Sequence, residues 1–200
     1  MFGLPEWSWY AIGGATGGLL LAHLVDVLAA SWKRYWRGDP AIATHFSPKG
    51  GCTEAVVAHV SGARFEVLVQ AYSFTSKEIA NALIAAVGRG VKVMVLLDKS
   101  NERETHTELG DLTAHGLEVL VDSCHAIAHN KVIVVDGRTV LTGSFNFTNQ
   151  AEHENAENLL ILQNHHDLAE KYRTNFHHHR EHCQHPGEAH IHHVRLRKAA

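Results

Sequence analysis

The sequence predicts an α/β domain, because segments with helical periodicity alternate with strand-like runs through the middle of the chain. The last third adds strand-like runs that have no helix between them. A chain of 200 residues, 45% of them hydrophobic, can bury the core of one domain and carry a modest appendage. We therefore expect a single α/β domain that occupies most of the chain.

Each element follows from its hydrophobic period and from the glycines and turns that end it. Helices are expected over residues 53–61, 76–87 and about 105–115, and from about 166 towards 183. Strands are expected over residues 65–72, 91–98, 117–121, 131–135, 139–142 and 158–162. Asp136-Gly137 forms the turn that joins the fourth strand to the fifth.

An apolar segment near the N-terminus predicts a membrane anchor. The stretch from Trp7 to Val25 has no Asp, Glu, Lys or Arg, and it is just long enough to span a bilayer as a helix. We expect an N-terminal hydrophobic helix over residues 1–35 that crosses the membrane once. Lys33 and Arg34 follow it, which favours the cytoplasmic side for the rest of the chain and leaves the periplasmic side open.

A cleavable signal peptide is the competing interpretation of this segment. Glu6 precedes the apolar run and no Lys or Arg does, contrary to the positive start of a signal peptide. Four glycines form overlapping small-xxx-small pairs, which either let two such helices pack closely or are ordinary glycines of a membrane helix. These are Gly13, Gly14, Gly17 and Gly18. We favour a retained anchor.

The run Arg37-Gly38-Asp39-Pro40 breaks the helix, so a linker is expected over residues 36–45. The globular domain is then expected over residues 46–183, followed by a histidine-rich tail over residues 184–200. Three cysteines are odd in number and far apart, which indicates free thiols rather than a disulfide framework. They are Cys52, Cys124 and Cys183.

Histidine is the outlier of the composition, with 18 residues. Many lie near the C-terminus: His177, His178, His179, His182, His185, His190, His192 and His193. They either bind a transition metal or belong to a solvated end with no ligand role. The sequence predicts no ordered ligand set among them.

Polar residues interrupt the buried strands at a few positions that together suit a phosphate group. Alternation along residues 131–135 places His129 and Lys131 on the same side of one strand. An imidazole can attack phosphorus, and an ammonium can neutralise the non-bridging oxygens. Ser144 and Asn146 can donate hydrogen bonds to the same group, and Glu157 can hold the second nitrogen of His129. The formal net charge of -3 means that any polyanion is gripped locally.

Each of these residues alone has a structural interpretation. His129 and Lys131 can be polar strand ends, Asp136 a turn former, and Gly143-Ser144 a second turn. Together, the spacing His-x-Lys-x4-Asp-x6-Gly-Ser-x-Asn resembles the signature of the phospholipase D superfamily. The resemblance extends over about three quarters of the chain, through Ala71-Tyr72-Ser73-Phe74-Thr75 and to the last helix.

The resemblance implies a phospholipase D-like catalytic domain over residues 46–183, folded as an α/β/α sandwich with a mixed sheet. It is similar to the small bacterial endonuclease branch, whose members carry one signature per chain and work as symmetric homodimers. It implies that His129 is a nucleophile forming a phosphohistidine, that the partner's copy protonates the leaving oxygen, and that Lys131 and Asn146 bind phosphate. Asp136 suits a structural partner as well as a catalytic residue. No cofactor and no metal are expected at this site.

Three functions remain open at this point. The first is an endonuclease acting on DNA or RNA, and the second is a phospholipase D or cardiolipin hydrolase acting on membrane phospholipids near the anchor. The third is a tethered protein that captures phosphodiesters without turnover. His45, His125 and Cys124 are either further substrate contacts or incidental, and His153 is a candidate acid should the shared site be wrong.

Overall fold

The computed structural model describes residues 22–29 and 38–188. The chain divides into two compact units, Met1–Asp39 and Pro40–Ala200. In the first unit, residues 22–29 are helical and exposed. Most of the predicted span from Trp7 to Val25 lies outside the described residues, and within them no helix has the length and apolar character needed to cross a bilayer.

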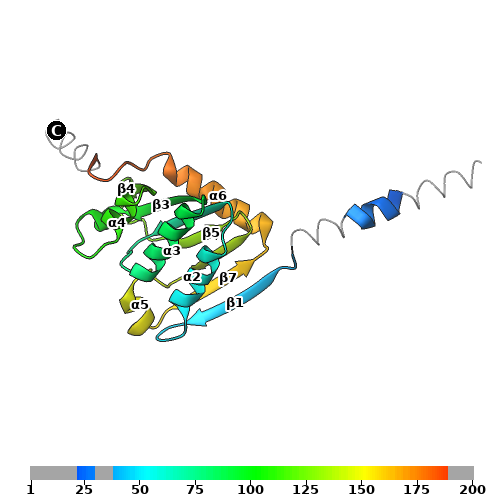
Figure 1. The fold of residues 1–200 in the computed structure, drawn as a ribbon, viewed down its shortest axis with the longest axis horizontal. Coiled ribbons are helices and arrows are strands. Elements are labelled where there is room, and N and C mark those ends of the chain that lie inside the picture. The colour runs from blue at the N-terminus through cyan, green and yellow to red at the C-terminus, as the bar shows by residue number, and fades with distance from the viewer. Residues whose placement is uncertain (1–21, 30–37, 189–200) are drawn as a thin grey trace, which may run out of the picture. The chain divides into compact units, whose positions relative to one another are not determined.

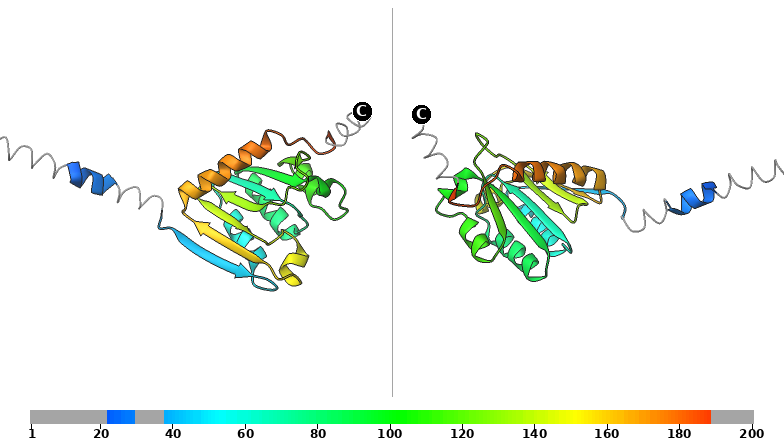
Figure 2. Two further views of the ribbon diagram at one scale, coloured as in Figure 1. Left: turned by 180° about the vertical axis from the view of Figure 1, so that it is seen from behind. Right: turned by 90° about the horizontal axis from the view of Figure 1, so that it is seen from above.

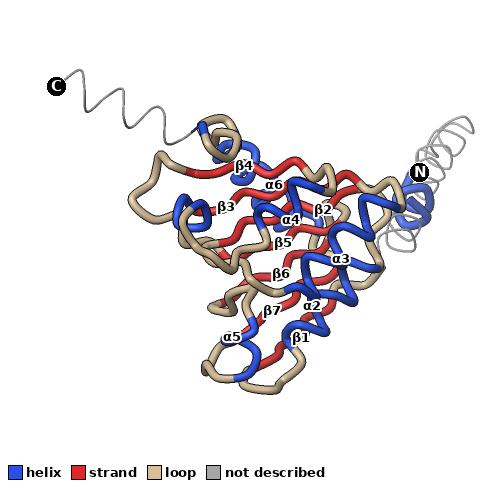
Figure 3. Tube along the Cα trace, turned by 60° about the vertical axis from the view of Figure 1, so that its left-hand side comes forward, coloured by secondary structure: helices blue, strands red, loops and turns tan. Residues whose placement is uncertain are grey.

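In the described part of the second unit, seven strands form one mixed sheet in the order β1-β7-β6-β5-β2-β3-β4 (Figure 3). The strands are β1 Ala41–Phe46, β2 Glu66–Ala71, β3 Lys92–Asp98, β4 Glu118–Asp122, β5 Lys131–Val135, β6 Thr139–Gly143 and β7 Asn158–Gln163. β2, β3 and β4 are parallel, whereas β5, β6, β7 and β1 each run antiparallel to the neighbour on their β2 side.

Helices cover both faces of the sheet (Figures 1 and 2). They are α2 Cys52–Ser61, α3 Lys77–Gly88, α4 Leu109–Ala114, α5 Asn149–His153 and α6 His166–Arg180, with a 3-10 turn at Lys99–Glu102. The buried residues of α2 and α3 share one core cluster with Val67 and Ile133, and α6 packs with Leu68 and Val134 in the other. Since neighbouring residues of a strand point to opposite faces, β2 and β5 are buried on both sides. The expected α/β/α sandwich with a mixed sheet is confirmed.

The expected elements match the structure closely except at three places. Residues 41–46 form the edge strand β1, although the sequence assigns most of them to a linker. β1 pairs with β7 but is exposed along most of its length, so it lacks the alternation that marks a half-buried strand. The expected helix at 105–115 begins only at Leu109. The short helix α5 is not expected from periodicity, because five residues are too few to show one.

The C-terminal segment is more ordered than a solvated tail. His177, His178 and His179 belong to the last turn of α6. Gln184 exchanges two backbone hydrogen bonds with Val121 of β4, of 2.7 and 3.0 Å. The start of the predicted tail is therefore attached to the sheet, while residues 189–200 lie outside the described part. The three cysteines are free thiols, as expected.

Candidate active site

The sheet topology brings most of the predicted site residues to one edge. Ala71 at the end of β2 lies opposite Lys131 at the start of antiparallel β5, and Val132 lies opposite Thr142 near the end of β6. Residues that follow β6 or precede β7 therefore reach the same edge. The residues gathered there are Tyr72, His129, Lys131, Ser144, Asn146 and Glu157.

His129 and Lys131 differ sharply in exposure. The His129 ring is exposed at the end of the loop that enters β5, whereas Lys131 is only 7% exposed. The Tyr72 ring stands beside both, with its centroid 4.6 Å from that of the His129 ring and 5.0 Å from Lys131 Nζ. Nζ of Lys131 donates one hydrogen bond to the His129 carbonyl oxygen at 3.1 Å, which leaves further ammonium protons for a ligand.

Burial lowers the pKa of the Lys131 ammonium below its ordinary value, and the Glu157 carboxylate opposes this effect. Oε1 of Glu157 accepts a hydrogen bond from Asn155 Nδ2 at 3.1 Å, and among the described residues Glu157 forms none with His129. The expected bond from Glu157 to His129 stays a prediction, since catalytic hydrogen bonds often tighten only when substrate is bound.

The turn after β6 places Ser144 and Asn146 by a close approach of two backbones. A Cβ on Gly143 would lie 2.2 Å from the Asn158 carbonyl oxygen, so only glycine fits there. That carbonyl accepts hydrogen bonds from the amides of Ser144 and Phe145, both at 3.1 Å. Ser144 Oγ accepts one from the Asn158 amide at 3.0 Å, so the Ser144 hydroxyl holds the turn as well as facing solvent.

The Asn146 side chain carries an unsatisfied hydrogen-bond acceptor. Its Oδ1 is buried and has no hydrogen-bond partner among the described residues. Leaving a buried polar atom without a hydrogen bond costs about 1–3 kcal/mol of folding free energy. Such an atom often has a partner that is not part of the chain, for example a ligand. The unpaired Oδ1 can accept a hydrogen bond from a ligand at the edge where His129 and Lys131 meet, whereas Nδ2 of the same amide is the atom that can donate to a phosphate oxygen.

Asp136 is the one signature residue that lies apart. It follows the far end of β5 from Lys131, and its carboxylate accepts hydrogen bonds from the backbone amides of Arg64, Phe65 and Glu66 at 2.8–3.2 Å. The four strand residues 132–135, at about 3.3 Å each, lie between Asp136 and Lys131, and His129 is farther still along the chain. The geometry favours the structural role that the sequence left open beside the catalytic one.

Replacing Asp136 with alanine is expected to lower the free energy of unfolding by about 1–3 kcal/mol, because three backbone amides lose their acceptor. Turnover per folded molecule is expected to stay within about tenfold of wild type. Urea unfolding and activity on the same samples measure the two effects, with exposed Asp111→Ala as the control. A loss of turnover in fully folded Asp136→Asn as large as that of a His129 variant would assign Asp136 to catalysis instead.

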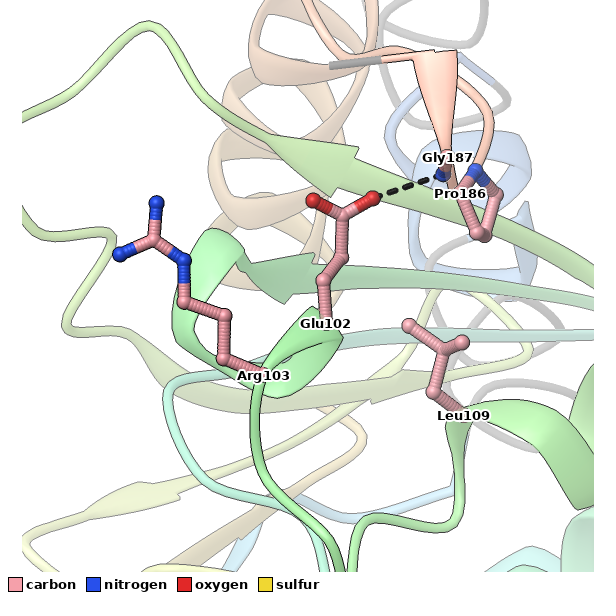
Figure 4. A pocket seen from close by; sticks show the side chains of 5 residues that line it. All are labelled: Glu102, Arg103, Leu109, Pro186 and Gly187. Atoms are coloured by element: carbon pink, nitrogen blue, oxygen red, sulfur yellow. Dashed lines mark hydrogen bonds between the residues drawn. The ribbon is translucent and has the colours of Figure 1, made fainter. Parts of the chain in front are cut away.

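The other histidines considered from the sequence lie elsewhere. The His45 ring contacts the Gly50 carbonyl oxygen at 3.2 Å, and His153 is exposed at the end of α5. His125 bonds to Asp122 Oδ2 at 2.9 Å rather than facing the site. An open pocket lies between the 3-10 turn and the C-terminal segment, where Glu102 accepts a hydrogen bond from the Gly187 amide (Figure 4). No signature residue lines this pocket.

Comparison with known proteins gives a consistent set of relatives. Residues 56–180 match the family described as "Cardiolipin synthase, PLD-like domain". Over 135 residues the chain is 42% identical to "Phospholipase D" of Rickettsia conorii, covering 68% of this chain and 67% of that protein. Over 90 residues it is 38% identical to "Mitochondrial cardiolipin hydrolase" of Xenopus tropicalis, covering 45% of this chain and only 43% of that protein.

Two solved structures share the fold over the same region. The phospholipase D family member Nuc from Salmonella typhimurium superposes with a TM-score of 0.71 at 33% identity, covering 73% of this chain and 97% of that one. NucT from Helicobacter pylori superposes with a TM-score of 0.67 at 23% identity, covering 73% of this chain and 99% of that one. The second likeness is evidence for the fold alone.

Proposed function

This chain belongs to the phospholipase D-like family and is a phosphodiesterase of that superfamily, and on that premise we propose that it is an endonuclease acting on DNA or RNA. The proposal includes a phosphohistidine intermediate at a site shared between two copies of the chain. The observation that carries it is half of a site at one sheet edge. Exposed His129, buried Lys131 and Asn146, whose Oδ1 has no partner among the described residues, meet there, and the chain supplies each of them once.

The arrangement supports a two-step displacement. Nε2 or Nδ1 of His129 attacks phosphorus, the bond from phosphorus to the leaving oxygen breaks, and His129 of a second copy gives that oxygen its proton. The second histidine then takes a proton from water, whose oxygen attacks the phosphohistidine and releases the phosphate product and free His129. Lys131 and Asn146 stabilise the charge on the non-bridging oxygens through both steps.

The likeness to Nuc supports a nucleic acid as substrate. The signature resembles that of the small bacterial endonucleases, and this chain covers nearly the whole of Nuc. The globular unit thus adds few residues to that fold. The formal net charge of the whole chain is -3, which favours binding of single phosphates at the site over a wide basic surface. Without a base-reading module, little sequence preference is expected.

Phospholipid hydrolysis is the second candidate, favoured by the names of the curated relatives. The "Phospholipase D" of Rickettsia conorii is the more similar of the two reported above, and the Xenopus relative is named for cardiolipin. The same phosphohistidine chemistry serves both substrates. The proposed N-terminal anchor would hold the site close to phospholipid head groups on the cytoplasmic side.

A substrate panel assayed in excess chelator tests the proposal. Full-length protein in detergent is expected to cleave labelled single-stranded DNA or RNA at least about tenfold faster than labelled phosphatidylcholine or cardiolipin in the same micelles. Activity is expected to persist in chelator, because paired lysines supply the charge that metals supply in two-metal nucleases. His129→Ala protein prepared in parallel measures contamination. Faster turnover of lipid would replace the nuclease assignment, and loss of activity in chelator that only magnesium restores would replace the mechanism.

A further inference from the structure

Four potential ligands converge between the end of β4 and the end of α6. They are Asp122, His125, His179 and His182, and their donor atoms all lie within 4.8 Å of one another. Asp122 ends β4, His125 follows it in the loop towards β5, His179 lies in the last turn of α6, and His182 follows that helix. Asp122 and His125 have two residues between them, and so do His179 and His182. One turn of the chain can therefore bring both members of a pair to the same side.

The distances are close to those of a tetrahedral metal site. Oδ2 of Asp122 lies 2.9 Å from Nδ1 of His125, 3.4 Å from Nδ1 of His179 and 3.6 Å from Nε2 of His182. Ligand atoms around tetrahedral Zn²⁺, with bonds of roughly 2.0–2.1 Å, lie about 3.3–3.4 Å apart. Small movements of the imidazole rings would therefore bring all four atoms onto one ion.

Burial and hydrogen bonding set this cluster apart from a chance group of surface histidines. The side chains of Asp122 and His179 are 3% and 17% exposed. Nε2 of His182 is buried and has no hydrogen-bond partner among the described residues. Oδ2 of Asp122 accepts hydrogen bonds from the rings of His125 and His179. Nε2 of His182 faces the same oxygen at 3.6 Å without forming a hydrogen bond to it. A cation at the centre would give all four atoms a partner.

The other oxygen of this carboxylate is held by the backbone. Oδ1 of Asp122 accepts hydrogen bonds from the backbone amides of Cys124 and His125 at 3.1 and 3.2 Å, which fixes the direction of Oδ2.

We propose that Asp122, His125, His179 and His182 form a structural site for a divalent transition metal, with Zn²⁺ the best match to three imidazoles and one carboxylate. The site is distinct from the phosphodiester site, because none of its ligands belongs to the signature. It joins α6 to the loop that carries His129.

The same loop is held at two further points. Ala128 donates its amide to Asp98 Oδ2 at 2.8 Å, and Lys99 Nζ donates to the His125 carbonyl oxygen at 2.6 Å. A metal bound to His125 would add a third attachment four residues before His129. The bound metal would reduce the motion of the loop that enters β5 and stabilise the domain, without adding a chemical step.

Cobalt titration of the full-length protein, purified without an added histidine tag, tests the site. One equivalent of Co²⁺ is expected to give the intense visible absorption of four-coordinate cobalt, which Zn²⁺ then abolishes. His179→Ala combined with His182→Ala is expected to weaken Co²⁺ binding by about a hundredfold or more. The matched control is His178→Ala, on the same helix and 75% exposed, with affinity within about threefold of wild type.

Stability gives a second readout. Zn²⁺ at a hundred times its Kd is expected to raise the Tm of wild type by about 5–10 °C and that of the double variant by less than about 2 °C. The double variant is expected to keep turnover within tenfold in chelator, since the metal is structural. Should circular dichroism show that this variant does not fold, His125→Ala on the exposed loop replaces it, with an expected loss of affinity of at least about tenfold.

The C-terminal histidines are the competing ligands. Full-length protein with His190, His192 and His193 all replaced by alanine is expected to keep the four-coordinate cobalt spectrum at one equivalent. Loss of that spectrum in the triple variant would assign binding to the tail and overturn the proposal. Equal Co²⁺ affinity in wild type and in folded His179→Ala/His182→Ala would overturn it as well.

Discussion

His129→Ala is expected to reduce phosphodiester turnover by at least about a thousandfold while the protein stays folded. In the proposed mechanism this one substitution removes both the nucleophile and, from the second copy, the acid that protonates the leaving oxygen. The fold is expected to survive because the His129 ring is exposed and, among the described residues, it contacts just one other ring, that of Tyr72. Turnover and urea unfolding of the same samples measure both effects.

A matched control is available in His115→Ala, since His115 is an exposed histidine at the end of α4. That variant is expected to keep wild-type turnover. His129→Asn adds a chemical test, because a phosphohistidine survives alkali: wild type quenched in alkaline detergent during turnover of a radiolabelled phosphodiester should retain label and the variant should not. Folded His129→Ala protein with turnover within tenfold of wild type would rule out His129 as the nucleophile.

The sequence predicts the central fold well because both faces of the sheet are buried. Strands such as β2 and β5 are nearly continuous apolar runs, and Ser76 caps the start of α3, where its hydroxyl accepts a hydrogen bond from the Ile79 amide. β1 escapes prediction because it is an exposed edge strand whose place is set by pairing with β7. Local periodicity carries no information on such long-range pairing.

The candidate site divides in the same way. The spacing along one strand predicts that His129 and Lys131 lie on the same side of it. The turn at Gly143 predicts that Ser144 and Asn146 lie just after a strand. The part played by Tyr72 depends on the neighbouring strands β2 and β5 and has no local signal. The cluster around Asp122 also escapes prediction, because two distant segments supply its ligands and the histidines of α6 look like the start of a tail.

Mixing wild-type protein with excess His129→Ala protein is expected to poison activity, because the proposed site needs one His129 from each of two copies. The chain carries a single His-x-Lys sequence, so a two-histidine mechanism needs two chains related by a two-fold axis. The exposed His129 beside buried Lys131 leaves the nucleophile open to a second copy. After complete random exchange with a ninefold excess of variant, only about a tenth of wild-type chains pair with another wild-type chain. Activity should therefore fall about tenfold.

The titration holds wild type constant and adds increasing variant, with exchange verified by mass spectrometry of isotope-labelled chains. The matched control is the same excess of His115→Ala, which is expected not to lower activity, because its site residues are intact. Independent sites in single chains would instead give constant activity at every ratio of His129→Ala. That result would end the shared-site mechanism and require an acid from within the chain. His153 would then be examined before His125, because His125 is already bonded to Asp122, whereas His153 is exposed at the end of α5.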